Sequence, residues 1–426
     1  INVPRDYWTQ VKDNELPPIV RFERQGGGKE AIENAAKLLS KAKFPVILSG
    51  AGVVLGGAID ECKKLAEKLD APVCNGYQHN DSFPGSHPLA VGPLGYNGSK
   101  AAMELISKAD VVLALGTRLN PFSTLPGYGI DYWPKKATII QVDINPDRIG
   151  LTKKVSVGIC GDAKQVAQQI IDKLTSDAGN TGREERKNLI HKTKSAWLQT
   201  LSGLDHEEDD PGTVWNKEAR ERDKDRMSPR QAWRAIQDAL PQDAIISSDI
   251  GNNCAIGNAY PTFEKPRKYL APGLFGPCGY GFPAILGAKI GCPDTPVVGF
   301  AGDGAFGISM NEMSSCAREE WPAITMVIFR NYQWGAEKRN SILWFDDNFV
   351  GTELDPELSY AKVANACGLK GVTCKTMEET TKAIKQSCED QKKGITTFIE
   401  IILNQELGEP FRLSLIHISE PTRPSQ

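Results

Sequence analysis

The chain has 426 residues, 24% of them charged and 40% hydrophobic, which is enough for two or three domains that each bury a core. Its formal net charge of −3 gives no electrostatic reason to expect nucleic acid or an anionic membrane as a partner, and no apolar stretch approaches the length of a membrane span. The ten cysteines form no Cys-x-x-Cys pair and the five histidines show no metal-ligand spacing, so we expect reduced thiols, no zinc site and a cytoplasmic location.

The first residues, Ile1 to Asp6, look like the last strand and exit loop of a domain whose body is not in the chain. We therefore expect residues 1–21 to be a domain remnant and a linker. Residues 22–174 then alternate short apolar runs with helical stretches, which predicts a parallel sheet covered by helices in a Rossmann-like, doubly wound domain. The expected strands are Val46–Ser49, Ala71–Cys74, Asp110–Leu115 and Ala137–Val142, and the expected helices include Lys29–Ala42 and Ile59–Leu69.

A glycine-rich turn follows the first of these strands. Gly50 and Gly52 match the start of the dinucleotide-binding fingerprint, but Leu55 stands where its third glycine would be. A tight strand-to-helix turn is the favoured interpretation, and a nicotinamide or flavin site is the alternative.

Residues 175–227 break the alternation. From Asp205 to Arg226, 14 of 22 positions are charged with mixed signs, which indicates a solvated helix and linker rather than a binding patch. Order resumes at Ser228 and Pro229, an N-cap followed by proline in the first helical turn. We expect a second doubly wound α/β domain from residue 228 to residue 403.

Two apolar runs in this second domain predict neighbouring strands, Thr295–Ala301 and Ala323–Phe329, with a helix expected over residues 307–319 between them. A strand–helix–strand unit makes the two strands parallel. Asp303 and Asn331, which follow the two strands, should therefore lie side by side at the carboxyl edge of the sheet, where open α/β sheets bind ligands.

A carboxylate and an amide oxygen at this edge suit Mg²⁺, which shares its oxygen coordination with substrate phosphates. Gly304, Ala305 and Phe306 open the crossover helix, whose unpaired N–H groups favour a bound anion. The pattern predicts a site for magnesium and a diphosphate. The alternative is that Gly302-Asp303-Gly304 is only a strand-to-helix turn; the chain has no P-loop motif that would indicate an ordinary nucleotide site.

These motifs resemble the thiamine-diphosphate-dependent enzymes related to acetolactate synthase, in which Gly-Asp-Gly is followed 25–30 residues later by Asn, often Asn-Asn. Here the pair is Arg330-Asn331, so only the second position is kept. The resemblance implies that thiamine diphosphate is the cofactor and that Asp303 and Asn331 bind Mg²⁺ through their side chains. It also implies that Gln333 contributes its backbone carbonyl and that Gly302 and Gly304 contact the diphosphate.

Two further segments carry the resemblance. Ser248 to Asn253 match a second diphosphate-contacting loop, in which Gly251, Asn252 and Asn253 would bind the cofactor; ordinary turn chemistry is the alternative. In the glycine-rich segment from Leu274 to Pro283, Cys278 stands where relatives place a large apolar residue that supports the bent cofactor.

Within the family, nearly all of residues 1–412 resemble the sulfoacetaldehyde acetyltransferases most closely. The resemblance implies that sulfoacetaldehyde and phosphate become acetyl phosphate and sulfite, in the degradation of taurine and other sulfonates. A carboligase or decarboxylase acting on 2-oxo acids, like acetolactate synthase, is the alternative. A nicotinamide oxidoreductase and a non-catalytic binding or scaffolding fragment are more distant ones.

The segment after Asn331 is the most discriminating, because it carries charges where acetolactate synthases are largely apolar. A sulfonate is a permanent anion that a guanidinium complements well. We expect Arg339 or Lys338 to meet the sulfonate, with Trp334 and Tyr280 as walls of the pocket. A solvated helix start is the alternative.

The family also sets expectations for the ends of the chain. The glutamate that activates the cofactor belongs to a pyrimidine-binding domain that would lie before Ile1, so no catalytic residue is assigned, and we expect the chain alone to bind cofactor weakly without turnover. An active site between subunits implies a homodimer or homotetramer. Within the tail 404–426, residues 413–426 do not continue the family pattern and are expected to be foreign to it.

Overall fold

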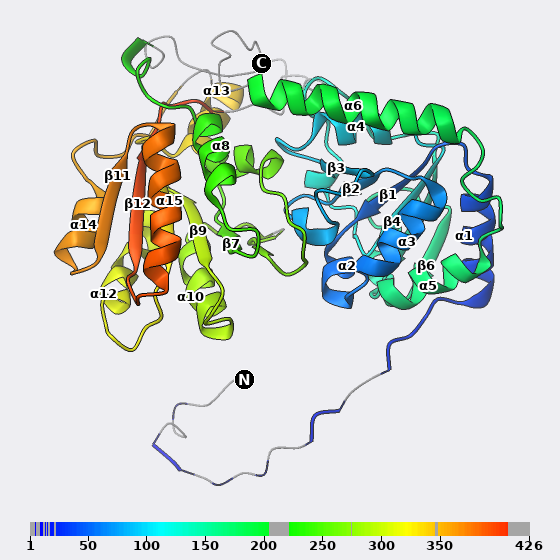
Figure 1. Ribbon diagram of the computed structural model, residues 1–426, viewed down its shortest axis with the longest axis horizontal. Coiled ribbons are helices and arrows are strands. Elements are labelled where there is room, and N and C mark those ends of the chain that lie inside the picture. Colours follow the sequence, from blue (N-terminus) through cyan, green and yellow to red (C-terminus); the bar gives the residue numbers. More distant parts are fainter. Residues whose placement is uncertain are drawn as a thin grey trace, which may run out of the picture.

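The computed structural model describes residues 5, 9–11, 13, 15, 18–20, 23–203, 221–273, 275–345 and 348–407. The expectations for more than half of residues 1–21, for most of the charged run after Asp205 and for most of the tail 404–426 therefore lie outside the described residues. Two α/β domains lie side by side, the first in blue and cyan and the second in green to red (Figure 1). None of the described helices is long and apolar enough to span a bilayer.

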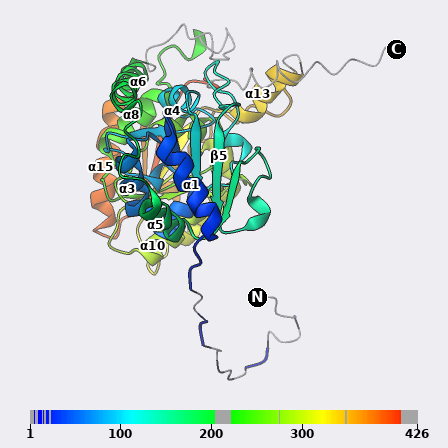
Figure 2. The ribbon, with the colours of Figure 1, turned by 90° about the vertical axis from the view of Figure 1, so that its right-hand side faces the viewer.

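The first domain is built on a six-stranded parallel sheet with the strand order β3-β2-β1-β4-β5-β6. Every residue of β1 and β4 is buried, which explains why these strands form continuous apolar runs: helices cover both faces of the sheet. Helices α1, α3 and α5 pack side by side on one face (Figure 2). The strands are β1 Pro45–Ser49, β2 Val73–Asn75, β3 Ala90–Pro93, β4 Val111–Leu115, β5 Thr138–Asp143 and β6 Val157–Cys160, and the helices are α1 Lys29–Lys41, α2 Ala51–Gly56, α3 Ile59–Leu69, α4 Lys100–Ile106, α5 Ala163–Lys173 and α6 Arg183–Gly203.

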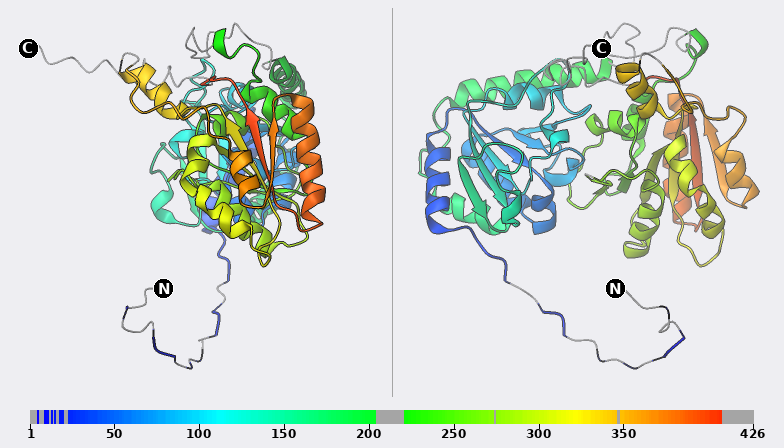
Figure 3. Two further views of the ribbon diagram at one scale, coloured as in Figure 1. Left: turned by 90° about the vertical axis from the view of Figure 1, so that its left-hand side faces the viewer. Right: turned by 180° about the vertical axis from the view of Figure 1, so that it is seen from behind.

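The second domain repeats this architecture with the strand order β11-β12-β10-β9-β7-β8, again all parallel (Figure 3). The prediction of two parallel, doubly wound domains is confirmed. The strands are β7 Ile245–Ser248, β8 Tyr269–Leu270, β9 Val297–Gly302, β10 Thr325–Arg330, β11 Lys370–Cys374 and β12 Thr397–Ile402, and the helices are α8 Pro229–Ala239, α9 Asn252–Ile256, α10 Gly281–Gly291, α11 Asp303–Ser309, α12 Met313–Cys316, α13 Gly335–Trp344, α14 Tyr360–Ala366 and α15 Met377–Gln391.

The crossover between β9 and β10 differs in detail from the expected helix over residues 307–319. It begins at Asp303, directly after the strand, and is divided into α11, a 3-10 turn at Met310–Glu312 and α12. The two strands are neighbours, as predicted. The earlier start matters for function, because it places the first turn of α11 at the sheet edge beside Asn331.

Within residues 175–227, which were expected to be a charged helical linker, helix α6 precedes the charged run of Asp205 to Arg226. Helix α6 lies along the top of the first domain and reaches towards the second (Figure 1). Its Arg186 is 1% exposed and donates hydrogen bonds to the backbone carbonyls of Lys43, Leu69 and Asp70, among others. A charged residue on a mixed-charge helix is therefore a buried cross-link, which local charge patterning did not indicate.

Buried polar contacts join the two domains. Asn80 of the first domain donates to the carbonyl oxygens of Asn258 and Pro261, at 2.8 and 2.9 Å. The carboxylate of Asp81 accepts from the N–H groups of Lys268 and Tyr269. Burial raises the pKa of Asp81, and these N–H groups oppose that shift. The edge strand β8 is thus held in place by side chains of the other domain.

Candidate cofactor and metal site

The register of β9 and β10 brings the two predicted metal ligands together. Gly302 lies opposite Phe329 in the parallel ladder, so Asp303 and Asn331 emerge beside each other just beyond the last pair. Both are buried, at 1% and 2% exposure. The juxtaposition expected from the two apolar runs is confirmed.

Two acceptor oxygen atoms and one end of the Asn331 side-chain amide converge at this point. That end lies 3.2 Å from Oδ1 of Asp303 and 3.3 Å from the backbone carbonyl oxygen of Gln333, and either the oxygen or the nitrogen of the amide can occupy it. Without a cation the amide nitrogen would be preferred there, because it would donate to both acceptors; a hard divalent ion reverses that preference. The donor set of one carboxylate, one amide oxygen and one carbonyl fits Mg²⁺.

This set contains only one acid. Among the described residues, no group of three or more His, Cys, Asp or Glu side chains is arranged to hold a metal. Asn331 and Gln333 do not belong to these residue types, because they would bind a metal through amide and carbonyl oxygens. A magnesium ion takes its remaining ligands from phosphates and water.

The residue between the two amide-bearing ligands has an unusual backbone. Tyr332 has a φ of 62°, in the left-handed region that non-glycine residues rarely adopt. This turn lets the Asn331 side chain and the Gln333 carbonyl point to one place. The Tyr332 ring lies between two guanidinium groups, 4.3 Å from that of Arg330 and 4.8 Å from that of Arg226, and such contacts offset the strain of the turn.

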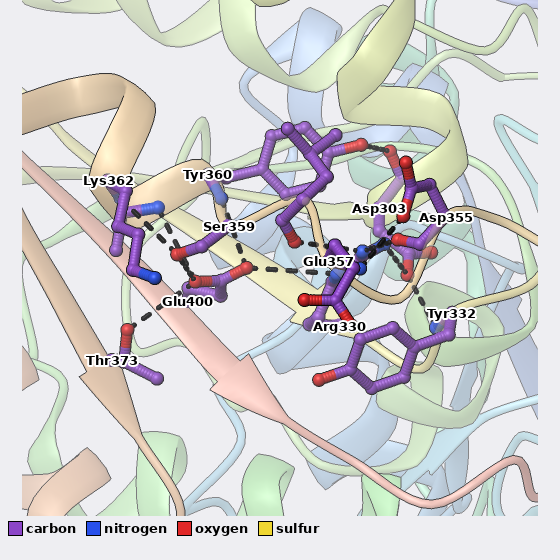
Figure 4. A network of polar contacts seen from close by, with 12 residues as sticks. Asp303, Arg330, Tyr332, Asp355, Glu357, Ser359, Tyr360, Lys362, Thr373 and Glu400 are labelled. Atoms are coloured by element: carbon purple, nitrogen blue, oxygen red, sulfur yellow. Dashed lines mark hydrogen bonds and ion pairs between the residues drawn. The ribbon is translucent and has the colours of Figure 1, made fainter. Parts of the chain in front are cut away.

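Asp303 has a cationic neighbour that the sequence did not single out as functional. Nη1 of Arg330 lies 3.0 Å from Oδ2 of Asp303, and both side chains are 1% exposed (Figure 4). Burial raises the pKa of Asp303 to about 6, while Arg330 and the Tyr332 N–H oppose the shift. The sequence could have indicated this neighbour only through the position of Arg330, a charged residue at the end of an apolar strand.

Backbone and amide groups form the part of the site that was predicted to meet a diphosphate. Gly304 begins α11 against the indole of Trp334, and a Cβ at Gly304 would lie 2.8 Å from the ring carbons. On the opposite loop, Gly251 has a φ of 122°, which requires glycine. Nδ2 of Asn252 and Oδ1 of Asn253 are buried without a hydrogen-bond partner, as expected of groups that await a ligand.

A buried carboxylate holds the glycine-rich segment. Asp249, at the end of β7, accepts hydrogen bonds from the N–H groups of Ile250, Gly279 and Gly281, at 2.8, 3.1 and 2.6 Å. Burial raises the pKa of Asp249, and these N–H groups oppose the shift. The bonds fix the loop that carries Cys278, whose thiol pKa is raised by burial and by the charges of Asp249 and Glu337.

These elements enclose a cavity of about 230 Å³. Most residues predicted to bind metal or cofactor line it, and Phe306 instead packs its ring into the core while its N–H stays in the first turn of α11. The sequence-based prediction missed several lining residues; the carboxylate of Glu337 is the most notable, and the others include Ile250, Gly276, Gly335 and Ala336.

Three residues predicted to surround the substrate lie outside the lining of this cavity. Lys338 pairs with Glu353, and Arg339 stacks 4.7 Å from the ring of Tyr96 in the first domain. Burial lowers the pKa of Arg339 to about 10. Tyr280 caps α10, and only Trp334 of the four lines the cavity.

The Gly50 turn of the first domain also borders a cavity, of about 600 Å³, at the carboxyl edge of its sheet. A Cβ on Gly52 would lie 2.6 Å from the Cα of Gly116. The glycines are therefore required by the close approach of the loops after β1 and β4, whether or not a ligand binds. This supports the interpretation as a tight strand-to-helix turn.

Comparison with known proteins agrees with this geometry. Residues 32–170 match the family model of the thiamine pyrophosphate enzyme central domain, and residues 249–401 match that of the C-terminal TPP binding domain. The chain is 77% identical to a probable sulfoacetaldehyde acetyltransferase of Rhizobium meliloti (strain 1021), with 97% of this chain and 70% of the relative covered. It is 74% identical to the sulfoacetaldehyde acetyltransferase of Roseovarius nubinhibens, with 97% and 68% covered. The structure of benzoylformate decarboxylase from Polynucleobacter necessarius is similar in fold, with a TM-score of 0.72 at 19% identity over 95% of this chain and 70% of that one.

Proposed function

Since the chain belongs to the sulfoacetaldehyde acetyltransferases, a branch of the thiamine pyrophosphate enzymes, we propose that it serves the conversion of sulfoacetaldehyde and phosphate to acetyl phosphate and sulfite. Such a reaction would belong to the degradation of taurine and other sulfonates that yield sulfoacetaldehyde. The observation that carries the proposal is the cavity at the ends of β7, β9 and β10, where buried oxygen atoms and amide groups lack partners.

Magnesium is the proposed tether between protein and cofactor. Asp303, Asn331 and the Gln333 carbonyl would supply three oxygen ligands, and the diphosphate would supply others. The first turn of α11 and the amides of Asn252 and Asn253 would donate to the remaining phosphate oxygens. The metal holds the diphosphate and is not expected to act on the bond that breaks.

When bound, thiamine diphosphate supplies the nucleophilic carbon and the electron sink for the chemistry. The chain's own residues enclose and orient it. Trp334 packs against Gly304 and covers the metal loop, and Cys278 forms the opposite wall on a segment that Asp249 fixes. Glu337, in the first turn of α13, brings a carboxylate to the mouth of the cavity, where it can exchange a proton with the substrate oxygen.

For the sulfonate, we favour Arg339 over Lys338, because Lys338 is engaged by Glu353. Arg339 lies where Tyr96 of the first domain meets Asn252 of the cofactor loop. In a chimaera that joins this chain to the part of the R. meliloti relative that it does not match, Arg339→Ala should raise the KM for sulfoacetaldehyde by about tenfold or more with little change in kcat. An unchanged KM would remove Arg339 from the substrate site.

The function is tested with a chimaera that joins this chain to the part of the R. meliloti relative that it does not match. We expect this protein to release sulfite and acetyl phosphate from sulfoacetaldehyde and phosphate. Carbon dioxide release from pyruvate without sulfite release would instead support an acetolactate-synthase-like activity. Light scattering of the chimaera tests the proposed homodimer or homotetramer, and localisation in a bacterial host tests the proposed cytoplasmic location.

A further inference from the structure

The end of β10 places a fully buried arginine against a predicted metal ligand. Arg330 is 0% exposed and stands where the related enzymes often carry a first asparagine. A guanidinium within 3.0 Å of a metal-binding carboxylate is unexpected, because the arginine and the metal compete for the same charge. The contacts of Arg330 indicate that it holds one oxygen of the Asp303 carboxylate.

The two oxygens of Asp303 have different partners. Oδ2 accepts from Nη1 of Arg330 at 3.0 Å and from the Tyr332 N–H at 2.6 Å. Oδ1 accepts from the Gly304 N–H at 3.0 Å and faces the Asn331 side chain. Oδ2 is therefore occupied, and Oδ1 alone is directed at the place where these groups converge.

Arg330 is itself immobilised, so it can hold Oδ2 firmly (Figure 4). Its Nε lies 3.8 Å from Oε1 of Glu400, and Nη2 donates to the carbonyl oxygens of Leu358 and Asp355. The rings of Tyr332 and Tyr360 flank the guanidinium at 4.3 and 5.4 Å. Hydrogen bonds from both terminal nitrogens, together with the two rings, restrict the orientation of the guanidinium, although Nε has no hydrogen-bond partner.

Glu400 anchors this arrangement from the neighbouring strand β12. Its carboxylate accepts from the Ser359 hydroxyl at 2.6 Å and from the Tyr360 N–H at 3.1 Å. The Tyr360 hydroxyl donates in turn to the backbone oxygen of Asp303 at 2.9 Å. The network thus ties the start of α14 to both ends of the Asp303 residue.

We propose that Arg330 is a positioning residue that makes Asp303 bind its metal through Oδ1 alone and so selects Mg²⁺ over larger divalent ions. Mg²⁺ demands octahedral coordination with single-oxygen ligands, whereas Ca²⁺ accepts both oxygens of one carboxylate at longer distances. With Oδ2 blocked, the second mode is closed. This inference rests on the proposed magnesium site and deepens it by assigning the origin of its selectivity.

The ratio of two affinities isolates this role. Mg²⁺ and Ca²⁺ carry the same charge, so the repulsion that Arg330 exerts on a cation cancels in the ratio of their dissociation constants. A general loosening of the fold also weakens both ions alike. Only a change in the coordination that Asp303 permits shifts the ratio.

The test is calorimetric titration of Mg²⁺ and of Ca²⁺ into the chimaera of this chain and the unmatched part of the R. meliloti relative, with thiamine diphosphate in excess and a correction for metal binding to the free cofactor. Arg330→Met should improve Ca²⁺ binding relative to Mg²⁺ by about tenfold. Arg330→Lys keeps the positive charge but lacks the forked guanidinium, so it should give an intermediate ratio. This variant also keeps the inference testable if Arg330→Met does not fold. Arg230→Met is the matched control, because it removes another buried arginine, paired to Glu406 at 3.0 Å, and should leave the ratio unchanged.

The outcomes separate this inference from the proposed function. Ratios within twofold of the unsubstituted chimaera in both Arg330 variants, with normal binding by that chimaera, would overturn the role of Arg330 alone. Failure of the unsubstituted chimaera to bind either ion with thiamine diphosphate would overturn the metal site and this inference together. A shifted ratio in Arg330→Met beside an unshifted one in Arg230→Met supports the proposal.

Discussion

The two domains of this chain share one architecture but use the same sheet edge differently. In the first domain, the acidic side chains at the carboxyl edge accept hydrogen bonds from nearby backbone N–H groups: Asp143 accepts from the Asn145 N–H at 2.9 Å, and Asp162 caps α5. In the second, Oδ1 of the buried Asp303 accepts from the Gly304 N–H of its own turn but also faces the Asn331 amide of the neighbouring strand, and the loop opposite carries the unpartnered amides of Asn252 and Asn253. A glycine turn at a strand end therefore does not identify a ligand site by itself; the convergence of polar groups from neighbouring strands and loops does.

Loss of the Asp303 carboxylate should have the strongest effect on metal binding. Asp303→Asn removes the negative charge of the proposed metal site, so affinity for Mg²⁺ with thiamine diphosphate should fall by about 100-fold or more. Asp143→Asn, at the equivalent edge of the first domain, should leave the affinity unchanged. Titration calorimetry on both variants decides the matter, and a similar loss in the two would refute the assignment of the site to the second domain.

The two edges should also respond to pH in opposite directions. Burial, with Arg118 nearby, lowers the pKa of His79 to about 4, so the stability it contributes is present above the ordinary value of 6.5 and is lost as pH falls towards 4. Burial raises the pKa of Asp303 to about 6, so its contribution is present below the ordinary value of 3.8 and is lost as pH rises through 6.

Urea unfolding in metal-free buffer between pH 4 and 6.5 measures both effects. His79→Gln should make the protein less sensitive to acid, by up to about 3 kcal/mol across this window. Asp303→Asn should make it more sensitive. Changes of the same sign in the two variants would contradict the opposite pKa shifts.

The sequence predicted much of this contrast and missed the rest for a physical reason. Apolar runs and turn glycines are local signals, so the pairing of β9 with β10 and the meeting of Asp303 with Asn331 were accessible. The insertion of β12 between β10 and β11 depends on contacts distant in sequence, and no local pattern encodes it. Arg330 was overlooked for the same reason, because its partner Glu400 lies 70 residues further along the chain on β12.

Glycine substitutions in the two strand-end turns should affect cofactor binding differently in the two domains. A Cβ at Gly304 would press on the movable indole of Trp334, whereas a Cβ at Gly52 would meet the backbone of Gly116. Both Gly304→Ala and Gly52→Ala should lower the free energy of unfolding, by about 1–3 kcal/mol. Only Gly304→Ala should also weaken cofactor binding, because Trp334 lines that cavity. Thermal unfolding and calorimetry on the two variants separate stability from binding, and weakened binding in Gly52→Ala would connect the first domain to the cofactor.

The smallest effect tests whether the first domain contributes to the cofactor site at all. The Tyr96 hydroxyl donates to Oδ1 of Asn252 at 3.2 Å, which orients the amide so that its unpartnered Nδ2 is left for a ligand. Tyr96→Phe removes one hydrogen bond, so cofactor affinity should fall by about fivefold. Tyr132→Phe removes a comparable bond, to the Ser123 carbonyl at 3.0 Å within the first domain, and should leave the affinity unchanged. Equal affinities for the two variants would mean that the first domain only supports the second. A loss of affinity confined to Tyr96→Phe would make the first domain part of the cofactor site, because the orientation of Asn252 would then depend on a side chain 156 residues earlier in the chain.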